Sequence, residues 1–204
     1  MERTNNYLIQ AQQARELFLT YDQEALIRKC HLKWDEVYLY VPMLHDLYRV
    51  HRATGSLERQ HGGQWQDANT FNEVLTLFDL LCDSREDRYL SGRLKNMTSF
   101  GLMFHQNLLE GARDPWAEQF QADLEGFRRA CIALGGVPFP SGDAAYAIEL
   151  FDGLPIVLQL WLGDEEFPPS LRFLWDENAG MYIRYETMFY AKALLLDRVS
   201  EEMA

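Results

Sequence analysis

Four acidic residues in the C-terminal part of the chain are the best candidates for a metal-binding or catalytic site. Asp143 precedes a strand-like run, and Asp164, Glu165 and Glu166 follow the next such run. Carboxylates that converge on one point supply the oxygen ligands that Ca²⁺ and Mg²⁺ require. Their mutual repulsion can also raise the pKa of one carboxyl and make it a general acid. The alternative is a set of hydrated turn residues, in which Asp143 accepts hydrogen bonds from nearby backbone N–H groups.

Whether these carboxylates lie close together depends on the relative directions of the strands that carry them. Asp152-Gly153 is a strong hairpin signal between the apolar runs at 144–151 and 155–162. A third run, at 171–176, follows after too few residues for a parallel crossover, which takes roughly a dozen or more. The three runs are therefore expected to form an antiparallel, up-and-down set.

This topology predicts two separate groups of acidic residues. Asp143 and Asp164 should lie at one rim of the sheet, because one begins the first strand and the other follows the second. Asp176 and Glu177 should lie at the opposite rim. A strand of about seven residues rises roughly 23 Å, so the two groups are too far apart to form one site.

Aromatic residues near the last helix suggest a second kind of site. Trp161 ends a strand, and Tyr182 and Tyr185 lie where the last helix begins. They could line a pocket between the sheet and the C-terminal helix that binds a ligand or a cofactor. Core packing is the ordinary role of such residues, and Trp and Tyr are also common at subunit interfaces. A binding pocket, a core and a homodimer interface therefore stay open as alternatives.

No complete catalytic motif accompanies either group. The histidines lack the HxxxH and HExxH spacing of zinc sites. No nucleophile elbow surrounds Ser99, and no helix start that would stabilise a thiolate surrounds Cys82. Gly62-Gly63 and Gly135-Gly136 lack the spacing of phosphate-binding loops. The sequence therefore indicates no particular cofactor.

Helical and strand-like patterns alternate irregularly along the chain. Strands are expected as a meander at 35–41, 46–52 and 56–60, with a polar loop at 61–69, and again in the three C-terminal runs. Helices are expected at 4–20, after the cap Asp22, after Asn69 or Thr70, at 102–111, from Asp114 to Gly135, and at the C-terminus. These elements predict an α+β fold, in which an antiparallel sheet built from a meander and a C-terminal up-and-down hairpin set is packed by N-terminal, central and C-terminal helices. Residues 1–204 contain no repeat or linker and are expected to form a single domain.

Composition restricts the partners. Lys and Arg total 19 against 31 Asp and Glu, a formal net charge of −12, which disfavours binding to nucleic acid or to anionic lipid. No apolar run approaches the roughly 20 residues that span a bilayer, and the N-terminus lacks the apolar centre of a signal peptide. Cys30, Cys82 and Cys131 lack CxxC spacing and are expected to be buried and unpaired. A cytoplasmic protein is the expectation.

The C-terminal third resembles a known family. Its pattern reads Gly-Asp at 142–143, a Pro-led strand at 155–161, Asp-Glu-Glu-Phe-Pro at 164–168, Leu-Trp-Asp at 174–176, and a helix bearing Glu186. This pattern closely resembles domain-of-unknown-function family 3786, a group of uncharacterised bacterial and archaeal proteins, and the meander resembles the family loosely. Trp175 stands where the family usually has Phe.

The resemblance implies an α+β cytoplasmic domain without an established activity. It adds Glu186 to Trp161, Tyr182 and Tyr185 as a candidate cofactor- or ligand-binding residue. Some relatives carry an attached iron–sulfur-cluster domain, and this chain lacks the cysteines for one. Any cluster would therefore come from an iron–sulfur protein partner.

These observations favour a non-catalytic accessory module that binds a small ligand, a cofactor or a partner protein. The first alternative is a divalent-cation-dependent hydrolase or transferase that uses Asp143, Asp164, Glu165 and Glu166. The second alternative is a structural homodimer.

Overall fold

The computed structural model describes residues 6–100 and 114–204. Within these residues, six α-helices and two antiparallel five-stranded sheets confirm the α+β class. The described residues form two compact units, the first within Met1–Tyr89 and Met181–Leu194, and the second within Leu90–Gly180 and Leu195–Ala204. The single domain stays a prediction.

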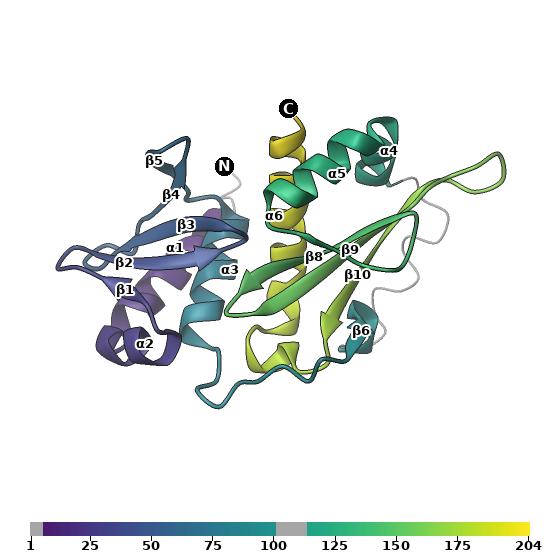
Figure 1. Ribbon diagram of the computed structural model, residues 1–204. Coiled ribbons are helices and arrows are strands. Elements are labelled where there is room, and N and C mark those ends of the chain that lie inside the picture. Colours follow the sequence, from purple (N-terminus) through teal and green to yellow (C-terminus); the bar gives the residue numbers. More distant parts are fainter. Residues whose placement is uncertain (1–5, 101–113) are drawn as a thin grey trace. The chain divides into compact units, whose positions relative to one another are not determined.

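The first unit is built on the meander. Its strands are β1 (Lys33–Trp34), β2 (Tyr38–Met43), β3 (Asp46–His51), β4 (Leu57–His61) and β5 (Gln64–Asp67), and they pair in that order (Figure 1). Gly55 has a φ of 68° in the turn that joins β3 to β4, a left-handed conformation that glycine adopts without strain. The predicted meander is therefore confirmed.

The fifth strand of the meander differs from the prediction of a loop at 61–69. Gly62 and Gly63 both have positive φ, and His61 pairs with Gln64 across them. Two left-handed residues in a two-residue connection make a tight hairpin turn. The Gly62-Gly63 pair is itself a hairpin signal, but the residues after it favour a loop, because β5 is largely exposed and Trp65 is its one apolar residue.

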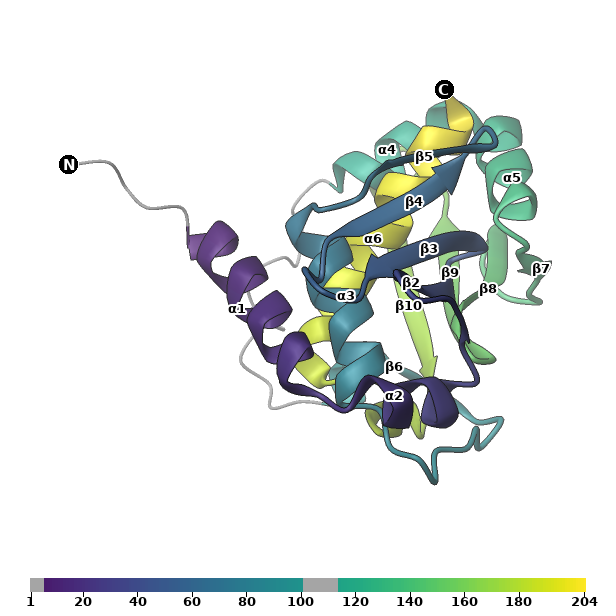
Figure 2. The same ribbon diagram turned by 90° about the vertical axis from the view of Figure 1, so that its left-hand side faces the viewer.

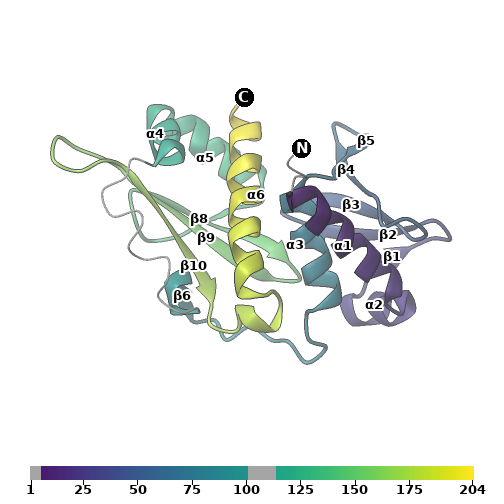
Figure 3. The same cartoon turned by 180° about the vertical axis from the view of Figure 1, so that it is seen from behind.

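Helices cover one face of this sheet. α1 (Asn6–Thr20) packs against α3 (Phe71–Cys82), and Figures 1 and 3 show both on the same side of the strands. The rings of Phe18 and Phe78 stack with centroids 4.8 Å apart. α2 (Gln23–Cys30) follows α1 directly (Figure 2), and the predicted cap Asp22 accepts hydrogen bonds from its first N–H groups.

The second unit contains the up-and-down set. β8 (Ala144–Phe151), β9 (Leu154–Trp161) and β10 (Ser170–Asp176) are antiparallel neighbours, as the short connections predicted. The short strands β6 (Leu94–Asn96) and β7 (Val137–Pro138) flank them in the order β6-β10-β9-β8-β7. The strands thus form two separate sheets instead of the one predicted, because short edge strands end the pairing of each ladder.

Two helices replace the predicted helix from Asp114 to Gly135. α4 (Pro115–Ala122) contacts β9 and β10, and α5 (Leu124–Ala133) contacts β8 (Figure 1). Asp123 breaks the helix with φ −133° and ψ 74°, and its Oδ1 accepts the Gly126 N–H at 2.8 Å. A short acidic side chain that bonds a backbone N–H competes with helical hydrogen bonds, so the second segment begins as a newly capped helix.

The remaining elements are two 3₁₀ turns, at Met97–Ser99 and Ala179–Met181, and α6 (Tyr185–Met203). The predicted helix at 102–111 lies outside the described residues. Among the described helices, none is long and apolar enough to cross a membrane.

The start of α3 offers a test of the fold. Thr70 Oγ accepts the Glu73 N–H, and the Glu73 carboxylate accepts the Thr70 N–H, which is a complete capping box. Thr70→Ala is expected to lower the free energy of unfolding by about 1 kcal/mol, measured by urea denaturation. Thr20→Ala is the matched control, because its hydroxyl only donates to an exposed carbonyl. Equal losses in the two variants would contradict the role of the cap.

Candidate functional site

The predicted acidic cluster lies at one rim of the second sheet, where its aspartates stabilise turns. Ala144 pairs with Leu160, which brings the start of β8 to the end of β9. Asp143 Oδ2 accepts the Leu162 N–H at 2.8 Å. Asp164 Oδ1 accepts two backbone N–H groups of its own turn, each at 2.8 Å. These bonds, led by the one from Phe167, lower the pKa of Asp164.

The geometry gives the predicted metal site no support. Glu165 and Glu166 are exposed. Within residues 6–100 and 114–204, no group of three or more His, Cys, Asp and Glu side chains is placed to hold a metal ion. Asp143 and Asp164 share a rim as expected, but one oxygen of each carboxylate already accepts backbone N–H groups. A cation site at this rim stays a prediction.

The opposite rim carries Asp176, which is 2% exposed. Its carboxylate accepts hydrogen bonds from the Ser91 N–H and hydroxyl, both at 3.0 Å, and from the N–H groups of Gly92 and Asn178, both at 2.8 Å. Burial by itself raises the pKa of Asp176, but these hydrogen bonds outweigh it and lower the pKa. Asp176 therefore joins the segment before β6 to the turn after β10.

The four predicted ligand-binding residues have different roles. Trp161 belongs to the second unit, where the Arg172 guanidinium lies 5.2 Å from its ring centroid. The other three belong to the first unit. Tyr182 is buried beneath the Arg88 guanidinium, and Tyr185 makes an edge contact with a neighbouring ring of α6. Glu186 lines a pocket.

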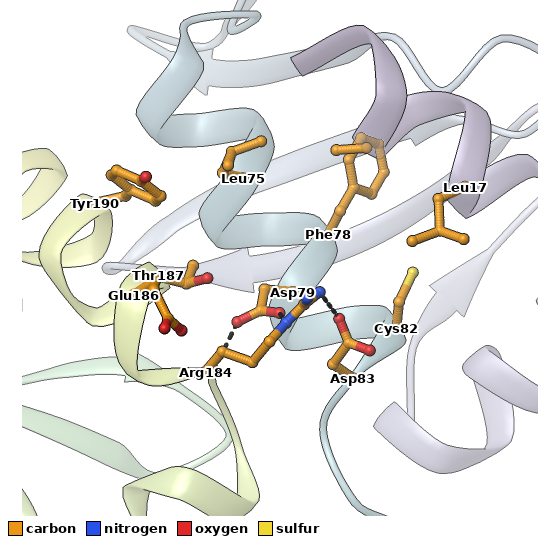
Figure 4. A pocket seen from close by; sticks show the side chains of 11 residues that line it. Leu17, Leu75, Phe78, Asp79, Cys82, Asp83, Arg184, Glu186, Thr187 and Tyr190 are labelled. Carbon is orange, nitrogen blue, oxygen red and sulfur yellow. Dashed lines mark hydrogen bonds and ion pairs between the residues drawn. The ribbon is translucent and has the colours of Figure 1, made fainter. Parts of the chain in front are cut away.

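That pocket has a volume of about 280 Å³ and lies within the first unit (Figure 4). Its apolar walls come from helices, with Leu17 from α1, Leu75 and Phe78 from α3, and Tyr190 from α6. Leu17 is 47% exposed, so this wall reaches solvent. This pocket differs from the predicted one between the sheet and the last helix, because helices line it and Glu186 is the one predicted residue among its lining.

One end of the pocket is charged. Asp79 is buried in α3, and its carboxylate accepts hydrogen bonds from Arg184 Nε at 2.5 Å and from the Arg184 backbone N–H at 2.8 Å. The guanidinium also pairs with Asp83, one helical turn further along α3. Figure 4 shows Arg184 reaching both carboxylates. The two aspartates therefore hold the residue that directly precedes α6.

The surroundings change the pKa of Asp83 and of Arg184. Burial, together with the neighbouring Asp79 carboxylate, raises the pKa of Asp83, and the Arg184 guanidinium only partly offsets these effects. Burial lowers the pKa of Arg184, but the bonds to Asp79 and Asp83 outweigh it and raise the pKa. The guanidinium therefore stays charged, while Asp83 takes up a proton more readily than an ordinary aspartate.

The Cys82 thiol also lines the pocket. Burial, and then the nearby Asp83 charge, raise its pKa to about 12. A thiol needs a lowered pKa to act as a nucleophile near neutral pH. Cys82 therefore contributes to the wall and not to covalent chemistry. Cys30 and Cys131 are likewise buried, and neither forms a disulfide among the described residues, as predicted.

Sequence reasoning missed the charged end of this pocket. The signal within reach was the spacing of Asp79 and Asp83, four residues apart on a strongly apolar helix. Arg184 lies 105 residues beyond Asp79 and carries no local signal. Only tertiary packing brings the three together.

The Asp79 pair generates a stability prediction. Arg184→Gln leaves a buried carboxylate without its cation, which is strongly destabilising in fully buried pairs. Arg184 is 60% exposed, so solvent reduces the effect, and a loss of about 2 kcal/mol in the free energy of unfolding is expected. Arg93→Gln is the matched control. It breaks the pair of a 77% exposed arginine with Glu177, which Lys95 still pairs, so only a small loss is expected. A smaller loss for Arg184 than for Arg93 would refute the assignment.

Asp176 generates a pH prediction. Its folded pKa lies below the ordinary value, so its contribution is fully present above about pH 4 and is lost as the pH falls through the folded pKa. Asp176→Asn is expected to cost about 2 kcal/mol at pH 7, because several N–H donors lose a charged acceptor. Urea denaturation of both proteins should show this difference shrinking below pH 4. A difference that does not change with pH would exclude the ionised carboxylate as its source.

Comparisons with known proteins agree with the C-terminal pattern. A family model described as Domain of unknown function (DUF3786) matches residues 22–198. No curated protein and no solved structure matches the chain. The matched segment contains Asp79, Asp83 and Arg184, whereas α1 precedes it. The chain therefore belongs to the DUF3786 family.

Proposed function

We propose that the protein is a non-catalytic binding module whose ligand occupies the pocket of the first unit. The observation that carries this proposal is the pocket itself, which combines apolar walls with one charged end. Ligand sites are typically concave and mostly apolar, with a few polar groups that fix orientation. At about 280 Å³, this pocket suits a ligand, or part of one, no larger than a single ring with a short chain.

The chemistry of the lining favours binding over turnover. The Cys82 thiol is protonated at neutral pH, and Arg184 is held in place by Asp79 and Asp83. Groups that are paired in this way fix the shape and charge of a site. The alternative of a cation-dependent hydrolase has no comparable support, because the aspartates proposed for it are engaged in turns.

The cellular compartment and the partners of the module are also part of the proposal. Three buried cysteines that form no disulfide are typical of a reducing compartment, which favours the cytoplasm. A partner protein that carries an iron–sulfur cluster and a homodimer both stay predictions.

Filling the pocket tests the function. Ala14 lines the pocket from α1, so Ala14→Phe should occupy its volume and abolish binding of small aromatic fragments seen by ligand-observed NMR. Gln13→Phe is the matched control, because it adds the same ring to an exposed position next along the helix, one that is not among the lining residues. We expect fragments to bind the parent protein and Gln13→Phe, and not Ala14→Phe. Equal binding to all three proteins would refute the pocket as the site.

A further inference from the structure

An unpaired hydroxyl lies in the pocket. Thr187 of α6 lines the pocket and is only 6% exposed. Among the described residues its hydroxyl has no hydrogen-bond partner, and Figure 4 shows it pointing toward the charged end. The hydroxyl faces the pocket, so it is open to a hydrogen bond from a bound molecule. Such a group in a pocket wall points to a ligand that provides the missing hydrogen bond.

The charge around this hydroxyl is negative. Asp79, Asp83 and Glu186 line the pocket against a single cation, Arg184, which leaves a formal excess of two negative charges. Glu186 has no hydrogen-bond or ion-pair partner within the described part of the chain, and it is exposed. Figure 4 shows Glu186 and Asp83 on either side of the Asp79–Arg184 pair. The unused carboxylate of Glu186 therefore lies beside the Asp79–Arg184 pair, and Asp83, already paired with Arg184, lies on its other side.

The C-terminal end of α3 adds to the negative charge around the pocket. Its last residues, Cys82 and the cap Asp83, lie at the pocket, and the C-terminus of a helix carries a partial negative charge. A cation of the chain itself already uses this end of the helix, since Lys29 Nζ donates to the carbonyls of Cys82 and Ser84 at 3.1 and 2.9 Å. Even with Lys29 counted beside Arg184, the three carboxylates outnumber the nearby cations, so the local field favours a positively charged group.

We infer that the pocket binds a primary ammonium group carried on a small apolar or aromatic body. This inference rests on the proposed function and names its ligand class. An ammonium has three N–H donors, which can bond the Thr187 hydroxyl and the unused Glu186 carboxylate, close to the charge of the Arg184-paired Asp83. The apolar body packs against Phe78 and Tyr190, whose rings also favour a nearby cation.

Three probes of one size test the charge preference. 2-Phenylethylamine is an ammonium at pH 7, 2-phenylethanol is its neutral counterpart, and 3-phenylpropionate is an anion. Titrations of the full chain, followed by NMR, are expected to give an affinity for the amine at least tenfold higher than for the alcohol. No saturable binding of the carboxylate is expected.

Variants locate the contacts. Glu186→Gln and Thr187→Val should each weaken amine binding about fivefold, the equivalent of one ordinary hydrogen bond, and leave alcohol binding within about twofold. Thr187→Ser keeps the hydroxyl and should retain the parent affinity. Glu165→Gln, at an exposed turn of the second unit, is the charge-matched control and should change nothing. Glu186 is a surface residue, so its variant tests the idea even where a Thr187 variant folds poorly.

The outcomes separate the two proposals. If the alcohol or the carboxylate binds as tightly as the amine and Ala14→Phe abolishes that binding, the ammonium assignment is wrong and the binding function stands. If none of the probes binds and Ala14→Phe behaves like the parent protein in the fragment screen, the proposed function fails and the ammonium assignment fails with it. Loss of amine binding in Glu165→Gln would also overturn the assignment.

Discussion

The buried carboxylate of Asp79 is the constraint on which the first unit depends. It lies on an apolar helix, where an unpaired charge would be very costly, and it is stabilised by the guanidinium and the backbone N–H of Arg184. Because Arg184 directly precedes α6, the same contacts hold the start of that helix against α3. The pocket lies beside this junction, so the contacts between Asp79 and Arg184 determine both its shape and the charge at one end.

Carboxylates serve the second unit in a different way. Asp143, Asp164 and Asp176 each accept backbone N–H groups at the ends of strands, and Asp123 does the same at the start of α5. These bonds satisfy donors that strand and helix ends leave open. Acidic residues close together in the sequence are therefore poor evidence for a metal site when each has N–H donors of its own turn within reach.

Local signals were enough for most elements and for the rims of the second sheet. Asp22 and Thr70 cap helices where their types predicted, and Asp152-Gly153 connects β8 to β9. The errors have local causes as well. β5 has no apolar alternation, and Asp123 interrupts a helical pattern whose apolar spacing continues through it.

The sequence by itself determined the α+β class, the antiparallel order of the C-terminal strands and the separation of the two acidic groups, because turn residues and connection lengths act locally. Tertiary structure alone decided where the pocket lies. Asp79, Arg184 and Thr187 come from segments about a hundred residues apart, and neither their contacts nor the unpaired hydroxyl follow from spacing. A site made by packing distant helices leaves no periodic signal in the sequence. The spacing of residues within one helix shows which of them share a face, but not which other helix that face will contact.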